Sequence, residues 1–392
     1  MGLHLLWQNS RAEFENKHIQ QIIAFAGHGK LQDENITSQE FREFLTQIPS
    51  VVLRRYADEC LASKFDDSGF ALQDVVNQIG LRLGFQVEYG RYRGTKTDSG
   101  HDGLWRFPDG HSVVVEVKTT DAYRIDTDKI ANYRKKLIAS DAIVESHSSI
   151  LIVVGRQDTG DLETQIRGSR HAWDIRLISV DALLRLMSLK EAVDDPKIIQ
   201  RICSILIPRE FTRLDEIIDI VFTAAEEAKS EETLIEVEED LEAAGIEVSK
   251  TSRPAAFHDA CIDILSQNKK IVLVKRTRNT YLTPDGKTAV VCAVSKVHSK
   301  QNRTSYWFAF HPYQKDFLET CLDSFLMLGC GARDQVLLIP FVDVKEWLDD
   351  LWTTELEDRM YWHIRLQQEG AQLFLNRKKG MGNLDVTRYL LS

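Results

Sequence analysis

Apolar and polar residues follow two different periods along this chain, and the change of period divides it into regions. Through residues 1–65, apolar positions recur every three or four residues, which predicts helices over 13–26 and 38–65, with Ser38 as the N-cap of the second. From residue 66 onward, short apolar runs typical of strands alternate with helical patterns. We therefore expect a helical N-terminal region followed by an α/β domain.

The region of residues 66–210 predicts a mixed sheet that helices bury on both faces. Its apolar runs are short and lack polar interruptions, as in strands that are covered on both sides. The expected strands are residues 85–89, 103–107, 112–118, 150–155 and 175–179, and the expected helices are residues 70–83, 128–138, 161–171 and 180–189.

A strongly acidic stretch, residues 211–247, separates this domain from the C-terminal part of the chain. It keeps one apolar stripe, so we expect a solvated helical connector; a mimic of nucleic-acid charge that regulates the basic part of the chain is the alternative. Residues 248–392 then predict an α+β domain for substrate recognition or dimerisation. Its expected strands are residues 271–276, 289–297, 305–310 and 336–340, its expected helices are 257–266 and 344–351, and a last hairpin covers 361–366 and 372–376.

Length and composition agree with several folded domains. The 392 residues are too many for one ordinary compact domain, and 43% hydrophobic with 28% charged residues is the balance of a globular protein. No apolar run approaches the length of a membrane span, and the N-terminus lacks the features of a secretory signal, so we expect a cytoplasmic protein without a membrane partner. The six cysteines are scattered and predict reduced thiols rather than disulfides or a zinc site.

The net charge of −10 is concentrated in one place. Residues 214–247 hold thirteen acidic residues and one basic residue, a net charge of −12, whereas residues 1–213 carry −2 and residues 248–392 carry +4. The rest of the chain is therefore close to neutral or mildly basic, which permits a face that binds phosphate groups.

Candidate chemistry gathers in one segment that predicts a β-hairpin. Glu116 and Lys118 are two residues apart on a strand and so project from the same face. Asp109 lies at the expected turn, about 23 Å from Glu116 along a strand that rises roughly 3.3 Å per residue, which is too far for a shared metal ion. Asp102 folds back across the turn and lands opposite Val117 or Lys118 to within one residue, so it is the expected first carboxylate.

These residue types suit the hydrolysis of phosphodiester bonds. Two clustered carboxylates bind hard divalent cations through oxygen, and Mg²⁺ keeps several waters, one of which can become the nucleophile. A lysine beside the metal can orient or deprotonate that water and stabilise charge in the transition state. Asp102, Glu116 and Lys118 are therefore the candidate catalytic residues, and the two acids are candidate ligands of Mg²⁺ or Mn²⁺.

Asp102 followed by Glu116-Val117-Lys118 resembles the D…(D/E)xK motif of the PD-(D/E)xK nuclease superfamily, over about residues 66–190. The resemblance implies a restriction-endonuclease-like fold and a Mg²⁺-dependent endonuclease of the kind used in bacterial restriction or anti-phage defence. It also implies DNA as the partner, with RNA as the alternative, and a homodimer, because a duplex has two strands to cut. The competing hypothesis is a non-catalytic protein with a degenerate nuclease fold that binds nucleic acid or another partner.

Two neighbouring helices complete the expected site. In this superfamily a helix before the motif often contributes another acidic residue, and the corresponding helix here offers Gln73 or Asp74, of which Asp74 is the expected third metal ligand. The helix after the motif often supplies a polar residue near the phosphate, which makes Tyr133, Arg134 and Lys135 candidate phosphate contacts. A solvated helix surface is the alternative for those three residues.

In the C-terminal domain, basic residues stand near aromatic residues, a combination that can bind phosphates and stack bases. Aromatic residues are more often part of a core, so nucleic-acid recognition and a structural or dimerisation role are both open alternatives. The residues concerned are Lys275, Arg276, Arg278, Lys296, His298, Lys300, Arg303, Tyr306, Trp307, Phe308 and Phe310.

Overall fold

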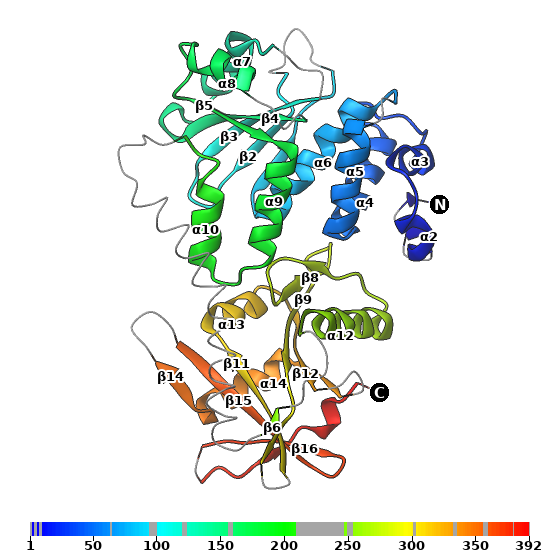
Figure 1. Cartoon of the computed structure of the whole chain (residues 1–392), viewed down its shortest axis with the longest axis vertical. Coiled ribbons are helices and arrows are strands. Elements are labelled where there is room, and N and C mark those ends of the chain that lie inside the picture. The colour runs from blue at the N-terminus through cyan, green and yellow to red at the C-terminus, as the bar shows by residue number, and fades with distance from the viewer. Residues whose placement is uncertain are drawn as a thin grey trace. The chain divides into compact units, whose positions relative to one another are not determined.

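The computed structural model shows a mixed α/β protein with two compact units (Figure 1). Unit 1 comprises Met1–Ala192 and Ile199–Ile218, and unit 2 comprises Val193–Ile198 and Asp219–Ser392. Nearly all of the acidic stretch lies outside the described residues, so the connector helix stays a prediction. The structure describes residues 2–391 except 4–5, 8–9, 63–64, 94–99, 120–123, 156–159, 209–246, 249–253, 301–302, 332–334, 356–359 and 379.

The N-terminal part of unit 1 is helical, but its helices are shorter than predicted. The helix expected over 38–65 is interrupted at Pro49, whose ring does not fit the interior of a helix. The prediction of Ser38 as the N-cap is also wrong: Asn35 caps the helix, and its side chain accepts a hydrogen bond from the Ser38 backbone N–H at 2.8 Å. The helices are α2 (Arg11–Glu15), α3 (Ile19–Phe25), α4 (Ile36–Gln47) and α5 (Ser50–Ala62).

A five-stranded sheet in the order β1-β2-β3-β4-β5 follows. Neighbouring strands are antiparallel from β1 to β3 and parallel from β3 to β5. Every strand and helix predicted for this region is present. The bounds are α6 (Ser68–Leu83), β1 (Gln86–Tyr89), β2 (Gly103–Arg106), β3 (Ser112–Lys118), α7 (Thr127–Ala139), η1 (Glu145–His147), β4 (Ser148–Val154), α8 (Gly160–Arg167), β5 (Ile175–Ser179), α9 (Val180–Glu191) and α10 (Pro196–Ser204).

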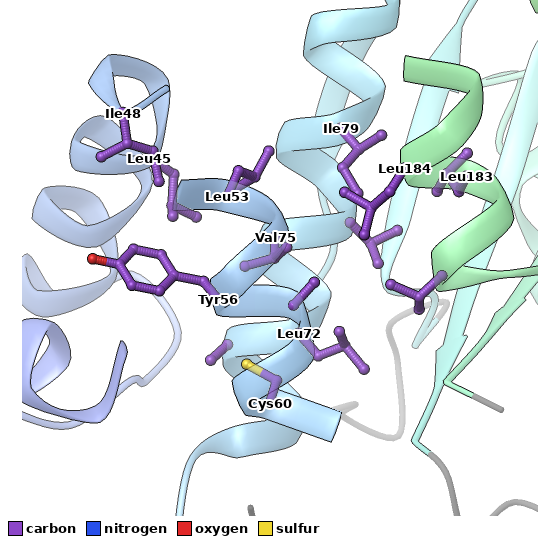
Figure 2. Close-up of a cluster of buried hydrophobic side chains, with 14 of the residues drawn as sticks. Leu45, Ile48, Leu53, Tyr56, Cys60, Leu72, Val75, Ile79, Leu183 and Leu184 are labelled. Atoms are coloured by element: carbon purple, nitrogen blue, oxygen red, sulfur yellow. The ribbon is translucent and has the colours of Figure 1, made fainter. Parts of the chain in front are cut away.

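Helices cover both faces of this sheet, as its apolar strands predict. Val113 and Val115 of β3 pack into a core with α6 and α9, whereas Val114 between them packs with α7 and α8 on the other face. Figure 2 shows the first core: side chains of α6, among them Leu72 and Val75, lie between those of α5 and those of α9. Residues of α3, α4 and α5 belong to the same core, so the N-terminal helices are part of unit 1.

Unit 2 contains two sheets. One has the order β17-β16-β15-β11-β10-β6 with β14 beside β15, and the other has the order β13-β12-β9-β8-β7. β12, which the sequence did not predict, runs parallel to β9 inside the second sheet. The bounds are β6 (Glu247–Val248), α12 (Pro254–Lys269), β7 (Val274–Lys275), β8 (Thr280–Leu282), β9 (Thr288–Ser295), β10 (His298–Lys300), β11 (Arg303–Phe310), α13 (Pro312–Glu319), β12 (Asp323–Cys330), β13 (Val336–Pro340), α14 (Phe341–Trp347), η2 (Leu348–Asp350), β14 (Thr353–Glu355), β15 (Met360–Glu369), β16 (Gln372–Leu375), β17 (Leu384–Asp385) and η3 (Thr387–Tyr389).

The two faces of β12 belong to different apolar cores. Leu328 packs in one core with Phe308 of β11, and the neighbouring Met327 packs in another with Phe257 of α12. All six cysteines are free thiols, as expected. Within the described part of the chain, no helix has the length and apolar character needed to cross a membrane.

Candidate active site

The hairpin of β2 and β3 brings Asp102 and Glu116 together. Gly103 and Val115 are the last pair of the β2–β3 ladder, and the Asp102 backbone N–H also donates to the Val115 carbonyl at 3.0 Å, so Asp102 lies just beyond the regular register. The sequence placed Asp102 opposite Val117 or Lys118 to within one residue, and its carboxylate contacts the Val117 backbone N–H at 2.7 Å. The negative charge of Glu116 acts on the Asp102 carboxyl group, so the two acids lie close together.

Asp109 lies at the other end of the hairpin, as predicted. Phe107 and Gly110 close the turn with a backbone hydrogen bond of 3.0 Å, and one carboxylate oxygen of Asp109 accepts the His111 backbone N–H at 3.0 Å. Asp109 therefore caps its own turn and stands seven residues along the strand from Glu116.

Three donors hold the backbone carbonyl of Asp102. They are the Gly90 N–H at 3.0 Å, the Gln73 amide at 3.0 Å and the Asn77 amide at 2.9 Å. The Asn77 side chain is itself fixed, because its oxygen accepts the indole N–H of Trp105 at 2.8 Å. The segment before β2 is thus tied to both α6 and the end of β1, which fixes the position of the Asp102 side chain.

Two glycines permit this close approach. A Cβ atom at Gly90 would lie 1.9 Å from the His101 carbonyl oxygen, and one at Gly103 would lie 2.2 Å from the Asn77 side-chain oxygen. No real Cβ tolerates such distances, so both positions require glycine. The sequence offered no signal for this role, because the contacts join residues that are far apart in the chain.

The carboxyl group of Asp102 is in an unfavourable electrostatic position. One of its oxygens accepts the Val117 backbone N–H at 2.7 Å. Burial, and next the negative charge of Glu116, raise the pKa of Asp102 to about 7, although the Val117 N–H and the positive charge of Lys118 act in the opposite direction. Asp102 therefore changes its charge near neutral pH.

Glu116 and Lys118 form an ion pair on β3. Glu116 is only 6% exposed, and one of its carboxylate oxygens pairs with the Lys118 ammonium. Its other oxygen, Oε2, is buried and has no hydrogen-bond partner among the described residues. A buried carboxylate oxygen without a donor is costly, and a bound cation would satisfy it.

The donor set fits a hard divalent cation such as Mg²⁺. This ion is commonly bound through one or two carboxylates, with waters and substrate phosphates completing its coordination. Asp102 and Glu116 supply the carboxylates. Within the described residues no group of three or more His, Cys, Asp and Glu side chains is placed to bind a metal, and among these residues the two acids are the ligands that we consider.

The structure does not bring Asp74 to this pair. The Asp74 carboxylate is fully buried, pairs with Arg42 of α4 at 3.0 Å, and accepts a hydrogen bond from the Tyr92 hydroxyl. Burial raises the pKa of Asp74 to about 6, and the charge of Arg42 opposes this shift. α6 packs on the sheet face of Val113, whereas Glu116 projects with Val114 from the other face. The residues of α6 that reach the hairpin are Gln73 and Asn77, whose amides donate to the Asp102 carbonyl.

The three candidates on α7 have different environments. Arg134 is buried and structural: it donates to the Ser148 hydroxyl at 2.9 Å and to the Glu145 carbonyl at 2.6 Å. Lys135 is exposed. Tyr133 is the candidate nearest to the site, because its ring packs against Gly100, two residues before Asp102.

Lys129, one helical turn before Tyr133, is a site residue that the sequence analysis missed. Its ammonium lies 5.9 Å from the centre of the Tyr133 ring, and a hydrogen bond with Tyr133 raises the pKa of Lys129. Its charge also acts on Asp102 and Glu116. The spacing of four residues between a lysine and a tyrosine on one helix was the available signal.

Comparison with known proteins adds no relative from which a role could be carried over. No protein-family model matches the sequence, and no curated protein is significantly similar to it. The function must therefore be argued from the geometry of Asp102, Glu116 and Lys118.

Proposed function

We propose that unit 1 is a metal-dependent nuclease with a restriction-endonuclease-like fold, and that Asp102, Glu116 and Lys118 are its catalytic residues. The observation that carries the proposal is the pairing of two carboxylates across a hairpin, beside a lysine, with Glu116 Oε2 buried and without a hydrogen-bond partner among the described residues. The order of elements supports it: α6 precedes the hairpin, and α7 and the buried strand β4 follow it.

Each residue has a distinct task in the hydrolysis of a phosphodiester. Asp102 and Glu116 would hold Mg²⁺ or Mn²⁺, which when bound neutralises phosphate charge and supplies an activated water. Lys118 would leave Glu116 once a cation replaces its charge, and its ammonium would then face the water and the phosphate. The ion pair between Lys118 and Glu116 keeps both side chains at the site until that exchange.

The protonation of Asp102 sets the condition for this exchange. With a pKa of about 7, the carboxyl group is largely protonated in mild acid and largely ionised in mild base. A protonated carboxyl is a poor ligand for a hard cation. Metal binding and cleavage should therefore increase as the pH rises through neutrality.

The proposed reaction, hydrolysis of a phosphodiester bond, indicates a nucleic acid as the substrate. We take DNA as the substrate and RNA as its alternative, and a homodimer as the active form on a duplex, because two strands must be cut. A restriction or anti-phage defence role in the bacterial cytoplasm is the biological setting that we propose for such an enzyme.

Cleavage of supercoiled plasmid, with and without Mg²⁺, tests the proposal. Asp102→Asn and Lys118→Met should each slow cutting by about a thousandfold, because each removes a group that acts on the metal or the phosphate. The matched control is Asp109→Asn, which changes the acid at the turn and should cut as the wild type does. Equal loss in all three variants, or undiminished cutting by Asp102→Asn, would overturn the assignment. Plasmid that stays intact with the wild type under every divalent metal would favour the non-catalytic alternative.

A further inference from the structure

The seven-stranded sheet of unit 2 has one buried face and one accessible face. Along β11, Tyr306, Phe308 and Phe310 are buried, whereas the intervening Trp307 and Ala309 are partly exposed. β15 repeats the pattern, with Ile364 and Leu366 in the core and their neighbours accessible. Figure 1 shows β11, β15 and β14 side by side, as their pairing requires. The accessible face therefore extends across at least three strands.

Aromatic side chains gather on this accessible face. Trp307, Tyr361 and His363 form a cluster in which ring centres lie 5.0 to 6.4 Å apart. The ring of His311, which precedes α13, lies 5.5 Å from Tyr361. Partly exposed rings gathered on one face of a sheet form a surface on which flat groups of a ligand can stack. We call these residues, together with Trp352 and Arg365, the aromatic face.

Hydrogen bonds hold the centre of the aromatic face rigid. The Trp307 indole N–H donates to Nδ1 of His363 at 3.0 Å, which leaves the proton of a neutral His363 on Nε2, where it can donate to the Thr354 hydroxyl at 2.7 Å. Burial lowers the pKa of His363, and the charge of Arg365 lowers it further. The neutral imidazole, hydrogen-bonded at both ring nitrogens, holds the neighbouring rings in place before a ligand binds. This order reduces the conformational entropy that the side chains lose on binding.

A cation accompanies the rings. The guanidinium of Arg365 lies 5.5 Å from the centre of the Trp352 ring, and Arg365 is itself exposed. Among the described residues of the strands, the acids that share this face are Glu369, the last residue of β15, and Asp385 of β17, and residues 248–392 carry a net charge of +4. Flat aromatic rings with an exposed guanidinium match a ligand that combines flat bases with phosphates.

We propose that the aromatic face binds single-stranded nucleic acid by stacking unpaired bases on Trp307 and Trp352, with Arg365 contacting the backbone. Base faces are covered inside a duplex and accessible only in a single strand or a displaced nucleotide. The proposal deepens the nuclease function, since unit 2 would then select substrates with unpaired segments. It does not require the metal site, because binding is expected without catalysis.

Fluorescence anisotropy of the full chain with labelled oligodeoxythymidylate, in EDTA, tests this. Trp307→Ala and Trp352→Ala should each weaken binding about tenfold, because stacking a base on one aromatic ring contributes about that factor. Trp352→Phe should keep most of the affinity, and Trp352→Leu should not. Arg365→Ala should lower the slope of log affinity against log salt by about 0.7, the value for one phosphate of a single strand.

Two controls separate the possible outcomes. Trp173 of unit 1 is 75% exposed and lies outside the aromatic face, so Trp173→Ala should bind as the wild type does. Val342 on α14 of unit 2 is 66% exposed and also lies outside the aromatic face, so Val342→Ala should bind normally as well. Equal affinity for a duplex of the same length, or equal loss in Trp173→Ala, would overturn the aromatic-face proposal. If the wild type cuts plasmid but does not bind the oligonucleotide, the aromatic-face proposal is wrong and the nuclease proposal stands. If the wild type binds the oligonucleotide but never cuts plasmid, the nuclease proposal is wrong and the aromatic-face proposal stands.

Discussion

Asp74 and Asp102 lie on neighbouring elements of unit 1, and burial raises the pKa of both, to about 6 and about 7. Their surroundings otherwise differ. Asp74 has a guanidinium at 3.0 Å and a phenol hydroxyl, whereas Asp102 has a backbone N–H and a second carboxylate. The charge of Asp74 is compensated by the protein itself, whereas the charge of Asp102 is opposed by Glu116.

This difference separates a structural acid from the one that we propose to be functional. A buried carboxylate with its own cation stabilises the fold and offers little to a ligand. Two acids held side by side repel each other until a cation arrives, and protein folds rarely keep such a pair without a use for it. Sequence position alone did not distinguish these two environments.

The largest effect that would sharpen the contrast concerns cleavage. Asp102→Asn should lose about a thousandfold in rate, whereas Asp74→Asn should cut at nearly the wild-type rate per folded molecule, because its carboxylate faces Arg42. Plasmid cleavage normalised to the folded fraction from circular dichroism measures both. A folded Asp74→Asn protein that cannot cut would show that Asp74 is a third metal ligand after all.

The next effect concerns stability. Arg42→Ala should lower the free energy of unfolding of unit 1 by about 3 kcal/mol, because it leaves the Asp74 carboxylate buried without its cation. Urea denaturation measures this. The matched control is Arg167→Ala, which breaks an exposed ion pair with Glu163 and should cost less than about 0.5 kcal/mol. Similar losses in both variants would contradict a structural role for the Arg42 and Asp74 pair.

A smaller effect is the pH dependence of the Asp102 site. The pKa of Asp102 is about 7 in the folded protein and about 3.9 in an unfolded chain. Between these values the folded state binds more protons, so its stability falls as the pH rises. Asp102→Asn removes this titration and should be about 2 kcal/mol more stable than the wild type near pH 8, allowing for partial solvent exposure, with no advantage near pH 4.

Thermal unfolding across this pH range, with and without Mg²⁺, measures the effect. Added Mg²⁺ should stabilise the wild type in mild base and leave Asp102→Asn unchanged, because the ionised pair binds the cation. A wild type more stable than the variant near pH 8 without metal would show that the two acids are not in conflict.

The smallest effect concerns two lysines of α7. Lys129→Ala should slow cleavage by up to about tenfold, because an exposed cation near Asp102 contributes only modestly. Lys135→Ala should have no effect, because six residues at about 3.6 per turn carry Lys135 round to another side of the helix. Plasmid cleavage near neutral pH compares the two variants. A larger loss of rate in Lys135→Ala than in Lys129→Ala would favour Lys135 as the phosphate contact, as the sequence analysis suggested.

The sequence predicted the sheet of unit 1 and its central hairpin well because their signals are local. Alternation at the end of β3 and the turn at Asp109 indicated the hairpin, whose regular pairing ends at Gly103 and Val115, next to Asp102. β12 was missed although Phe325–Leu328 is an apolar run, because so short a run does not by itself distinguish a strand from a buried helical segment. The break in the N-terminal helix had a local signal, Pro49, which the apolar periodicity on either side obscured.

The candidate site was harder to predict where it depends on contacts between distant segments. Residues 71–80 of α6 are all buried, so burial alone did not reveal which of them faces the hairpin. Asp74 is held by Arg42, thirty-two residues earlier, and Asn77 holds Asp102, twenty-five residues later. Such partners follow from the packing of helices on a particular sheet face, which no single window of sequence contains.

The core that joins the N-terminal helices to α6 constrains how this protein can change over evolutionary time. Phe41 and Phe44 of α4 share that core with Val115, one residue before the proposed metal ligand Glu116. A recombination event that exchanged the first helices for foreign ones would have to reproduce their packing or lose the hairpin with them. We therefore expect the first helices and the sheet of unit 1 to be inherited together.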